Sequence, residues 1–210
     1  MKAAPLAWTA GSLLLALASS PLRAADDFAF VDPSAPEVAA VVAAGEAATK
    51  QVAVKLMAEL TVAIASSGPV AAHEVCHLKA LPLTAEKLPG LPQVVSAKRT
   101  SLKLRNPANR PDAAEAATLA HLARLVDRGE PTPPLVLQRL GPATAPAEWR
   151  VYRPILVQPA CLTCHGDPAA QPAELRAALQ QRYPQDAATG YKEGDWRGLI
   201  SATVVPHPHD

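Results

Sequence analysis

The chain has 210 residues, with 20 Lys and Arg against 19 Asp and Glu, so its formal net charge is +1. This length is enough for one domain with a full hydrophobic core. The charge alone argues neither for nor against nucleic acid, but no basic run or aromatic-interleaved patch is present, so we expect no nucleic-acid partner.

The first residues follow the order of a secretory signal. Lys2 precedes an apolar stretch from about Leu6 to Ala18, and small residues surround Ala24. The apolar part is too short to span a bilayer comfortably. We therefore predict a signal peptide over residues 1–24, export to the periplasm, and no membrane span after cleavage. An uncleaved N-terminal anchor is the alternative.

Two helices are predicted next. Ser34 and Glu37 have the spacing of a capping box, with a proline inside the first turn. The run from Glu37 to Ser66 contains no proline and one glycine, Gly45, which is the position where we expect any kink. This long helix should end at the sequence SSGP, and a second helix should follow from Val70 to about Ala80.

The rest of the chain predicts strands alternating with helices. Period-two alternation at the end of Val94–Arg105 indicates a half-buried strand. Asp112 and Glu115 begin a further helix, which closes on Gly129. The remaining predictions are strands over 135–140 and 148–157, a short helix over 172–183, and a final strand over 197–205. This order predicts an α+β domain with one antiparallel sheet that carries helices.

The sequence CLTCH contains Cys161, Cys164 and His165. Cys-x-x-Cys-His is the attachment sequence of c-type haem. Each thiol adds to a vinyl group and becomes a thioether, and the histidine is then held beneath the ring, where it can bind iron. His165 would therefore be the proximal ligand.

The motif has three other interpretations. A redox-active dithiol also uses C-x-x-C near a strand-to-helix junction. A zinc site would need further ligands, for which Cys76 with His73 or His77 is available. The two cysteines could also be merely structural. The export signal and the histidine that directly follows Cys164 favour haem.

The second axial ligand has several candidates: His73, Cys76, His77, His121, His207, His209 and Met57. Met57 lies at an apolar mid-helix position typical of a core residue, and His121 shares a polar helix face with arginines. Periodicity does not separate the three candidates of the second helix. The redox compartment favours Cys76, because an odd thiol in an oxidising compartment is safe when bound to iron as thiolate.

Several longer segments resemble a known family. They are VCHLKA, RTSLKLRNPANRPD, YRPILVQPACLTCHG and ATGYKEGDWRGLISATV, in this order from about Val70 to Val205. The chain resembles the c-haem domain family named after a cyanobacterial Tll-type protein, a domain of unknown function. The resemblance implies a PAS-like antiparallel sheet with flanking helices that holds one covalent haem. It also implies Cys76 as the distal ligand opposite His165, and His77 is a departure that could compete with it.

We therefore predict a signal peptide over 1–24, an N-terminal helical segment over 25–68 and, from the resemblance, a PAS-like c-type haem domain over 69–206. Arg99 and Arg105 are candidates to neutralise haem propionates; the alternative is a solvent-facing strand edge and turn.

An anionic thiolate stabilises ferric iron, so we expect a low potential. The expected function is a periplasmic haem-based redox or ligand sensor that acts on a separate redox or signalling protein. The alternative is an electron carrier. A haem enzyme is not expected, because a bound Cys76 closes the distal site.

Overall fold

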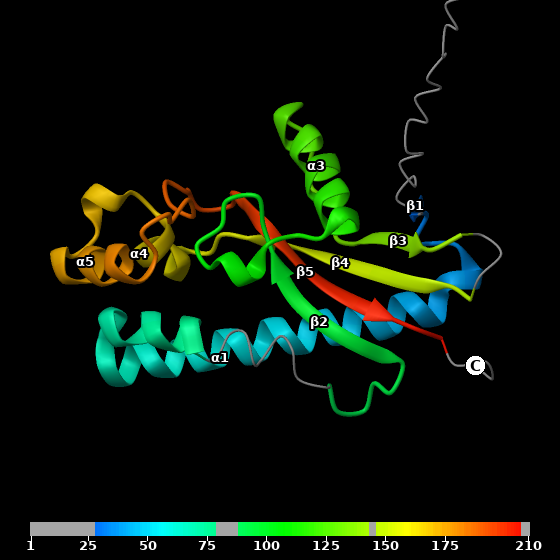
Figure 1. The fold of residues 1–210 in the computed structure, drawn as a ribbon, viewed down its shortest axis with the longest axis horizontal. Helices are drawn as coiled ribbons and strands as arrows, with labels where there is room; N and C mark the ends of the chain where they lie inside the picture. The colour runs from blue at the N-terminus through cyan, green and yellow to red at the C-terminus, as the bar shows by residue number, and fades with distance from the viewer. Residues whose placement is uncertain (1–27, 79–87, 143–145, 207–210) are drawn as a thin grey trace, which may run out of the picture.

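The computed structural model describes residues 28–78, 88–142 and 146–206, and in the first range it describes side chains only as far as Ala72. The predicted signal peptide and the tail histidines His207 and His209 therefore lie outside the described residues. Five strands form one sheet in the order β1-β3-β4-β5-β2, and every neighbouring pair is antiparallel. Helices lie on both faces of this sheet (Figure 1). The predicted α+β class with an antiparallel sheet is confirmed.

The strands are β1 (Phe28–Val31), β2 (Val94–Thr100), β3 (Val136–Leu140), β4 (Glu148–Leu156) and β5 (Trp196–Val204). β5 comes last in the chain, yet it lies inside the sheet between β4 and β2. Four of the strands match the predicted segments, whereas β1 was not predicted. It is a short edge strand that pairs only with β3, with Phe28 opposite Leu140.

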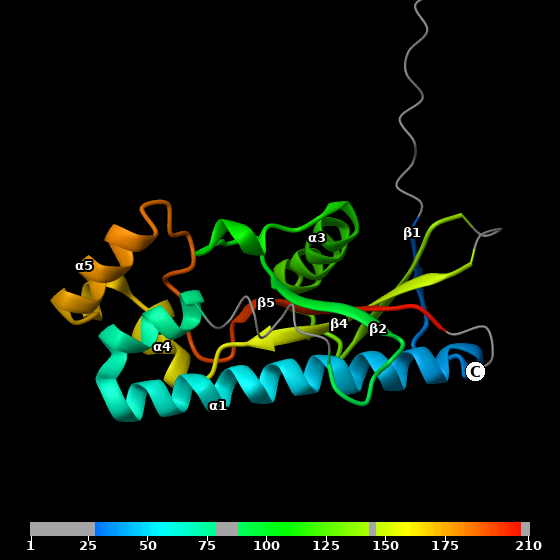
Figure 2. The same ribbon diagram turned by 60° about the horizontal axis from the view of Figure 1, so that its bottom comes forward.

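The long helix α1 (Ala39–Leu78) crosses one face of the sheet (Figure 2). A short 3-10 turn, η1 (Pro36–Val38), leads into it, so the predicted helix start is correct. The predicted capping box is wrong, because the Ser34 hydroxyl donates to Asp32 instead of capping the helix. By length and composition alone, Pro36–Ala72 could cross a membrane, and among the described residues it is the one helix that could.

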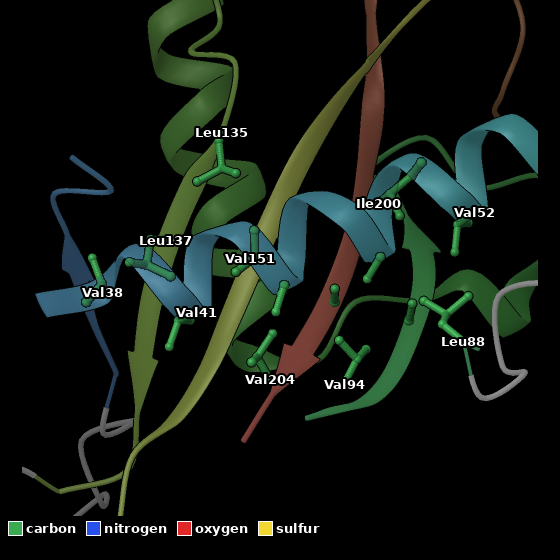
Figure 3. Close-up of a cluster of buried hydrophobic side chains, with 14 residues drawn as sticks. Val38, Val41, Val52, Leu88, Val94, Leu135, Leu137, Val151, Ile200 and Val204 are labelled. Carbon is green, nitrogen blue, oxygen red and sulfur yellow. The ribbon is translucent and has the colours of Figure 1, made fainter. Parts of the chain in front are cut away.

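Small and β-branched side chains pack α1 against the sheet. Val38, Val41 and Val52 are buried against Val151 of β4 and Ile200 of β5 (Figure 3). Gly45 lies between them and is not a kink, since the one non-helical residue inside α1 is Gly68. The absence of a side chain at Gly45 instead lets α1 approach β4 closely, because a Cβ at this position would overlap the side chain of Val151.

Gly68 divides α1 into two parts. Its φ of 75° and ψ of 174° are non-helical, and Pro69 follows directly. Positive φ suits glycine, and proline cannot supply the amide hydrogen that a continuous helix needs. The part after the break turns toward α4 (Leu162–His165) and α5 (Ala173–Arg182) (Figures 1 and 2). The predicted end of the first helix at SSGP and the start of a second helix are thus confirmed.

The opposite face of the sheet carries α3 (Ala113–Asp127). Asp112 and Glu115 form the predicted capping box, in which each side chain accepts the other residue's backbone N–H. Leu119 and Leu122 are fully buried in a cluster with residues of β3, β4 and β5. The chain thus has a core on each side of the sheet.

The strand predicted over Val94–Arg105 ends earlier than expected. β2 stops at Thr100, which pairs with Leu199 of β5. Ser101 then turns the chain, as its hydroxyl binds the backbone carbonyls of Lys103 and Arg197. Leu102 is exposed, so the alternation that suggested a longer strand does not correspond to an inner and an outer face.

Candidate functional site

One cavity lies between α1, the ends of β2 and β4, and the cysteine motif. Its wall on α1 is apolar and consists of Ala53, Leu56, Met57, Leu60, Ile64 and Ala72. Its polar lining includes Arg99, Thr100, Ser101, Arg105, Asn106, Asn109 and Arg197. Cys161, Cys164 and His165 also line it, so the three motif residues open onto a single space.

The motif follows β4 almost directly. The 3-10 turn η3 (Pro159–Cys161) and the single helical turn of α4 place Cys161, Cys164 and His165 in succession. Neither Cys161 nor Cys164 forms a disulfide. At the end of the motif, Gly166 packs so closely on the preceding turn that a Cβ would overlap the carbonyl oxygen of Leu162. The sequence therefore folds the motif into a compact turn at the edge of the cavity.

A loop more than twenty residues later in the chain orients His165. The Nδ1 atom of His165 lies 2.7 Å from the carbonyl oxygen of Ala188. A carbonyl only accepts hydrogen bonds, so Nδ1 carries the hydrogen and Nε2 keeps its lone pair. The backbone N–H of Tyr191 also donates to the carbonyl of His165. The imidazole is thus fixed in the tautomer that can bind a metal through Nε2.

The pKa of His165 is lowered to about 3. Burial is the largest cause, and the positive charges of Arg105 and Arg197 add to it. The hydrogen bond to Ala188 acts in the opposite direction but does not compensate. At neutral pH the imidazole is therefore uncharged, as a metal ligand must be.

Arg105 forms a hydrogen bond with the backbone of the cysteine motif. Its Nε donates to Asp186 at 2.9 Å, and its Nη2 donates to the carbonyl oxygens of Cys164 and Ala188. The side chains of Arg105 and Asp186 are each 12% exposed. The alternative of a solvent-facing turn is therefore wrong for Arg105, which lies inside the site and fixes its backbone.

Sequence reasoning missed a third arginine. Arg197, at the start of β5, lines the cavity together with Arg99 and Arg105. It donates to the hydroxyl of Ser101, and its guanidinium lies 5.3 Å from the centroid of the Tyr191 ring. Burial lowers its pKa. The ATGYKEGDWRGL segment contains both Tyr191 and Arg197, and its resemblance to the family was the one available signal.

The prediction that Met57 is a core residue is wrong. Met57 is 39% exposed and lines the cavity. The prediction failed because the apolar stripe of α1 continues past the end of the sheet. His121 of α3 does not line the cavity; its ring contacts Phe30, with centroids 5.0 Å apart.

The side chain of Cys76 lies outside the described residues, as do those of His73 and His77. The helix that carries them is nevertheless placed: Val70 packs against the cluster of Leu175, Leu179 and Tyr183, and Ala72 lines the cavity. Among the described residues, no three His, Cys, Asp or Glu side chains gather as a metal site. The zinc alternative requires the undescribed side chains and stays untested.

This residue set fits a covalently held haem. Two cysteines and a neutral imidazole with a lone pair on Nε2 open onto one cavity. Aliphatic side chains of α1 provide an apolar surface for a porphyrin face, and three arginines provide positive charge for carboxylate groups.

Comparisons with known proteins give one family and one fold. The Tll0287-like family model matches residues 35–205 of the chain. A search of curated proteins gives no match. Among solved structures, the cyanobacterial heme-protein Tll0287 covers 86% of this chain and 100% of its own length, at 23% sequence identity and a TM-score of 0.51. At this identity the likeness concerns the fold, and it confirms the PAS-like sheet with flanking helices.

Proposed function

Because this chain belongs to the Tll0287-like family, we propose that it is an exported c-type haem protein in which Cys161 and Cys164 attach one haem covalently and His165 binds its iron. The observation that carries the proposal is the hydrogen bond from His165 Nδ1 to Ala188, formed beside two cysteines on one cavity. The solved neighbour is itself named a heme-protein, which supports haem as the group.

Each part of the cavity has a task in this proposal. The aliphatic side chains of α1, among them Leu60 and Ile64, exclude water from one face of the ring. Arg99, Arg105 and Arg197 offset the negative charge of the two propionates. Arg105 contributes less than the other two, since its Nε and Nη2 hydrogens already bind backbone carbonyls and Asp186, whose negative charge opposes its own. When bound, the haem supplies a one-electron Fe(III)/Fe(II) couple.

Cys76 is the proposed ligand on the opposite side. The helix that carries it contacts α5, and its Ala72 lines the same cavity as Cys164. A thiolate favours ferric iron, whereas reduction weakens the bond and protonation can release it. Such a site suits a redox-linked or ligand-linked sensor that acts on a separate protein in the periplasm. A bound Cys76 also closes the side at which a haem enzyme would take its substrate, so binding rather than turnover is the proposed activity.

The alternative function is electron transfer to a periplasmic partner. The fully apolar wall on α1 favours it, because an apolar shell limits the access of solvent to a redox centre. The two functions differ in what reduction does to the iron: a sensor exchanges or loses Cys76, whereas a carrier keeps both ligands in both states.

The test is to express the full chain in a host that attaches c-type haem. Intact mass should show one haem per chain, retained after denaturation. A Cys161→Ala, Cys164→Ala variant should lose this covalent mass, and Arg128→Gln, on the far side of the sheet, should keep it. A colourless wild-type protein would refute the proposal. Ferric and ferrous absorption spectra then separate a sensor from a carrier.

A further inference from the structure

A partly buried ion pair lies beside the loop that binds the proposed iron ligand. Asp186 accepts the Nε hydrogen of Arg105 through Oδ2 at 2.9 Å and the backbone N–H of Ala188 through Oδ1 at 2.8 Å. One carboxylate therefore binds both the guanidinium and the backbone N–H of the residue whose carbonyl binds His165. With each side chain only 12% exposed, water screens this pair weakly.

The carbonyl oxygen of Ala188 is shared. It accepts the Nδ1 hydrogen of His165 at 2.7 Å and the Nη2 hydrogen of Arg105 at 3.4 Å. A hydrogen bond from Nδ1 to a carbonyl raises the basicity of an imidazole ligand. A cation on the same oxygen draws electron density away from that acceptor. Arg105 therefore acts on the iron ligand in two ways, by its charge and through the shared oxygen.

The charge of Arg105 reaches the imidazole. The Nη2 group of Arg105 and the Nδ1 group of His165 bind the same Ala188 oxygen, so the positive charge of Arg105 lies close to the imidazole. Ferric iron carries one more positive charge than ferrous iron, so a nearby cation favours the ferrous state and raises the potential. Asp186, at 2.9 Å from Arg105, opposes this effect.

We propose that the Asp186–Arg105 pair sets the redox potential of the iron: Arg105 is a positioning residue that fixes Ala188 and Cys164, and Asp186 cancels its charge. This inference rests on the proposed haem site. It assigns a role to Asp186, which contacts neither the cysteines nor the imidazole and which the sequence motif does not include.

The experiment measures the midpoint potentials of four holoproteins by spectroscopic titration: wild type, Asp186→Asn, Arg105→Gln and the double variant. Asp186→Asn should raise the midpoint potential by at least about 59 mV, which corresponds to a tenfold change in the Fe(III)/Fe(II) ratio for a one-electron couple. Arg105→Gln should lower it by a similar amount. The double variant, which is neutral at both positions, should return close to wild type.

The Arg128–Glu130 pair at the end of α3 gives a matched control, because it is also an ion pair but is exposed. Arg128→Gln should leave the potential unchanged. Shifts of the same sign in both single variants, or shifts no larger than this control, would overturn the inference. A merely structural pair would lower thermal stability in all three variants without this opposite-sign pattern.

If Asp186→Asn or Arg105→Gln does not take up haem, Arg105→Lys and Asp186→Glu decide the matter. Both retain the charges, so both should keep the wild-type potential, and a tenfold shift in either would overturn the inference. A failure of the proposed function looks different, because the wild-type protein itself would then carry no haem.

Discussion

Gly45 of α1 lies so close to Val151 of β4 that a Cβ atom at residue 45 would overlap the valine side chain. The contact sets the distance between the helix and the sheet. It matters for the site because the same helix continues past the sheet and forms the apolar wall of the cavity with Leu56, Met57 and Leu60.

The first prediction is that Gly45→Ala destabilises the protein. At an open helix position this change stabilises by roughly 1 kcal/mol, whereas overpacking a closed contact costs about 1–3 kcal/mol. Denaturant unfolding of the holoprotein should show the lower free energy of unfolding. Ala43 is exposed on the same helix, so Ala43→Gly is the control that measures only the difference in helix propensity between alanine and glycine. A Gly45→Ala protein more stable than wild type would contradict the packing described here.

The second prediction concerns the cap of α3. Asp112 accepts the backbone N–H of Glu115 and binds Arg150 at 2.9 Å. Burial acts to raise its pKa, but these two contacts hold the pKa below the usual value. The resulting stabilisation is present above the unfolded pKa of about 3.9 and is lost as the pH falls through the folded pKa.

Asp112→Ala should therefore lower the free energy of unfolding by about 1 kcal/mol at neutral pH. Asp112→Asn keeps a capping oxygen but loses the charge, so it should cost less at neutral pH and flatten the decline of stability in acid. Unfolding curves at several pH values test both variants. If Asp112→Ala and Asp112→Asn lower the free energy of unfolding equally, the capping hydrogen bond contributes nothing to stability.

The third prediction identifies the distal ligand. Cys76→Ala should change the ferric absorption spectrum and raise the potential, because a thiolate is lost. His77→Ala and His73→Ala, on the same helix, should leave the ferric spectrum unchanged. If His77→Ala changes only the ferrous spectrum, then His77 replaces Cys76 on reduction. An unaltered ferric spectrum for Cys76→Ala would eliminate Cys76 as a ligand.

The fourth prediction concerns Arg197, which lines the cavity beside Arg99 and Arg105. Arg197→Leu should lower the potential by tens of millivolts, because a buried positive charge near the iron is removed. Arg197→Lys should retain most of the wild-type value. The exposed Arg128→Leu is the control for a charge change far from the cavity. An unchanged potential in Arg197→Leu would mean that its charge does not reach the iron.

The sequence predicts the parts of this fold that depend on short-range rules. The capping box at Asp112 and the break at Gly68-Pro69 are written in adjacent residues, and both form as predicted. β1 escaped prediction because a four-residue edge strand depends on its partner β3. The extension of β2 past Thr100 failed because contacts of Ser101 with Arg197, distant in sequence, turn the chain away.

The site divides in the same way. Cys161, Cys164 and His165 form a local motif, and the structure brings them to one cavity. Arg197 reaches that cavity, and Asp186 and Ala188 reach Arg105 and His165, only through tertiary folding, and no spacing rule connects them to the motif. Met57 was misplaced because an apolar helix stripe indicates burial without stating whether protein or another group covers it.

The place of β5 within the sheet has a consequence for biogenesis. Trp196–Val204 must insert between β4 and β2, and two of its residues, Arg197 and Ile200, complete the cavity. During synthesis or translocation the two cysteines emerge before this strand. In the proposed haem protein, the thiols therefore stay accessible to an attachment enzyme until this last strand pairs with β4 and β2.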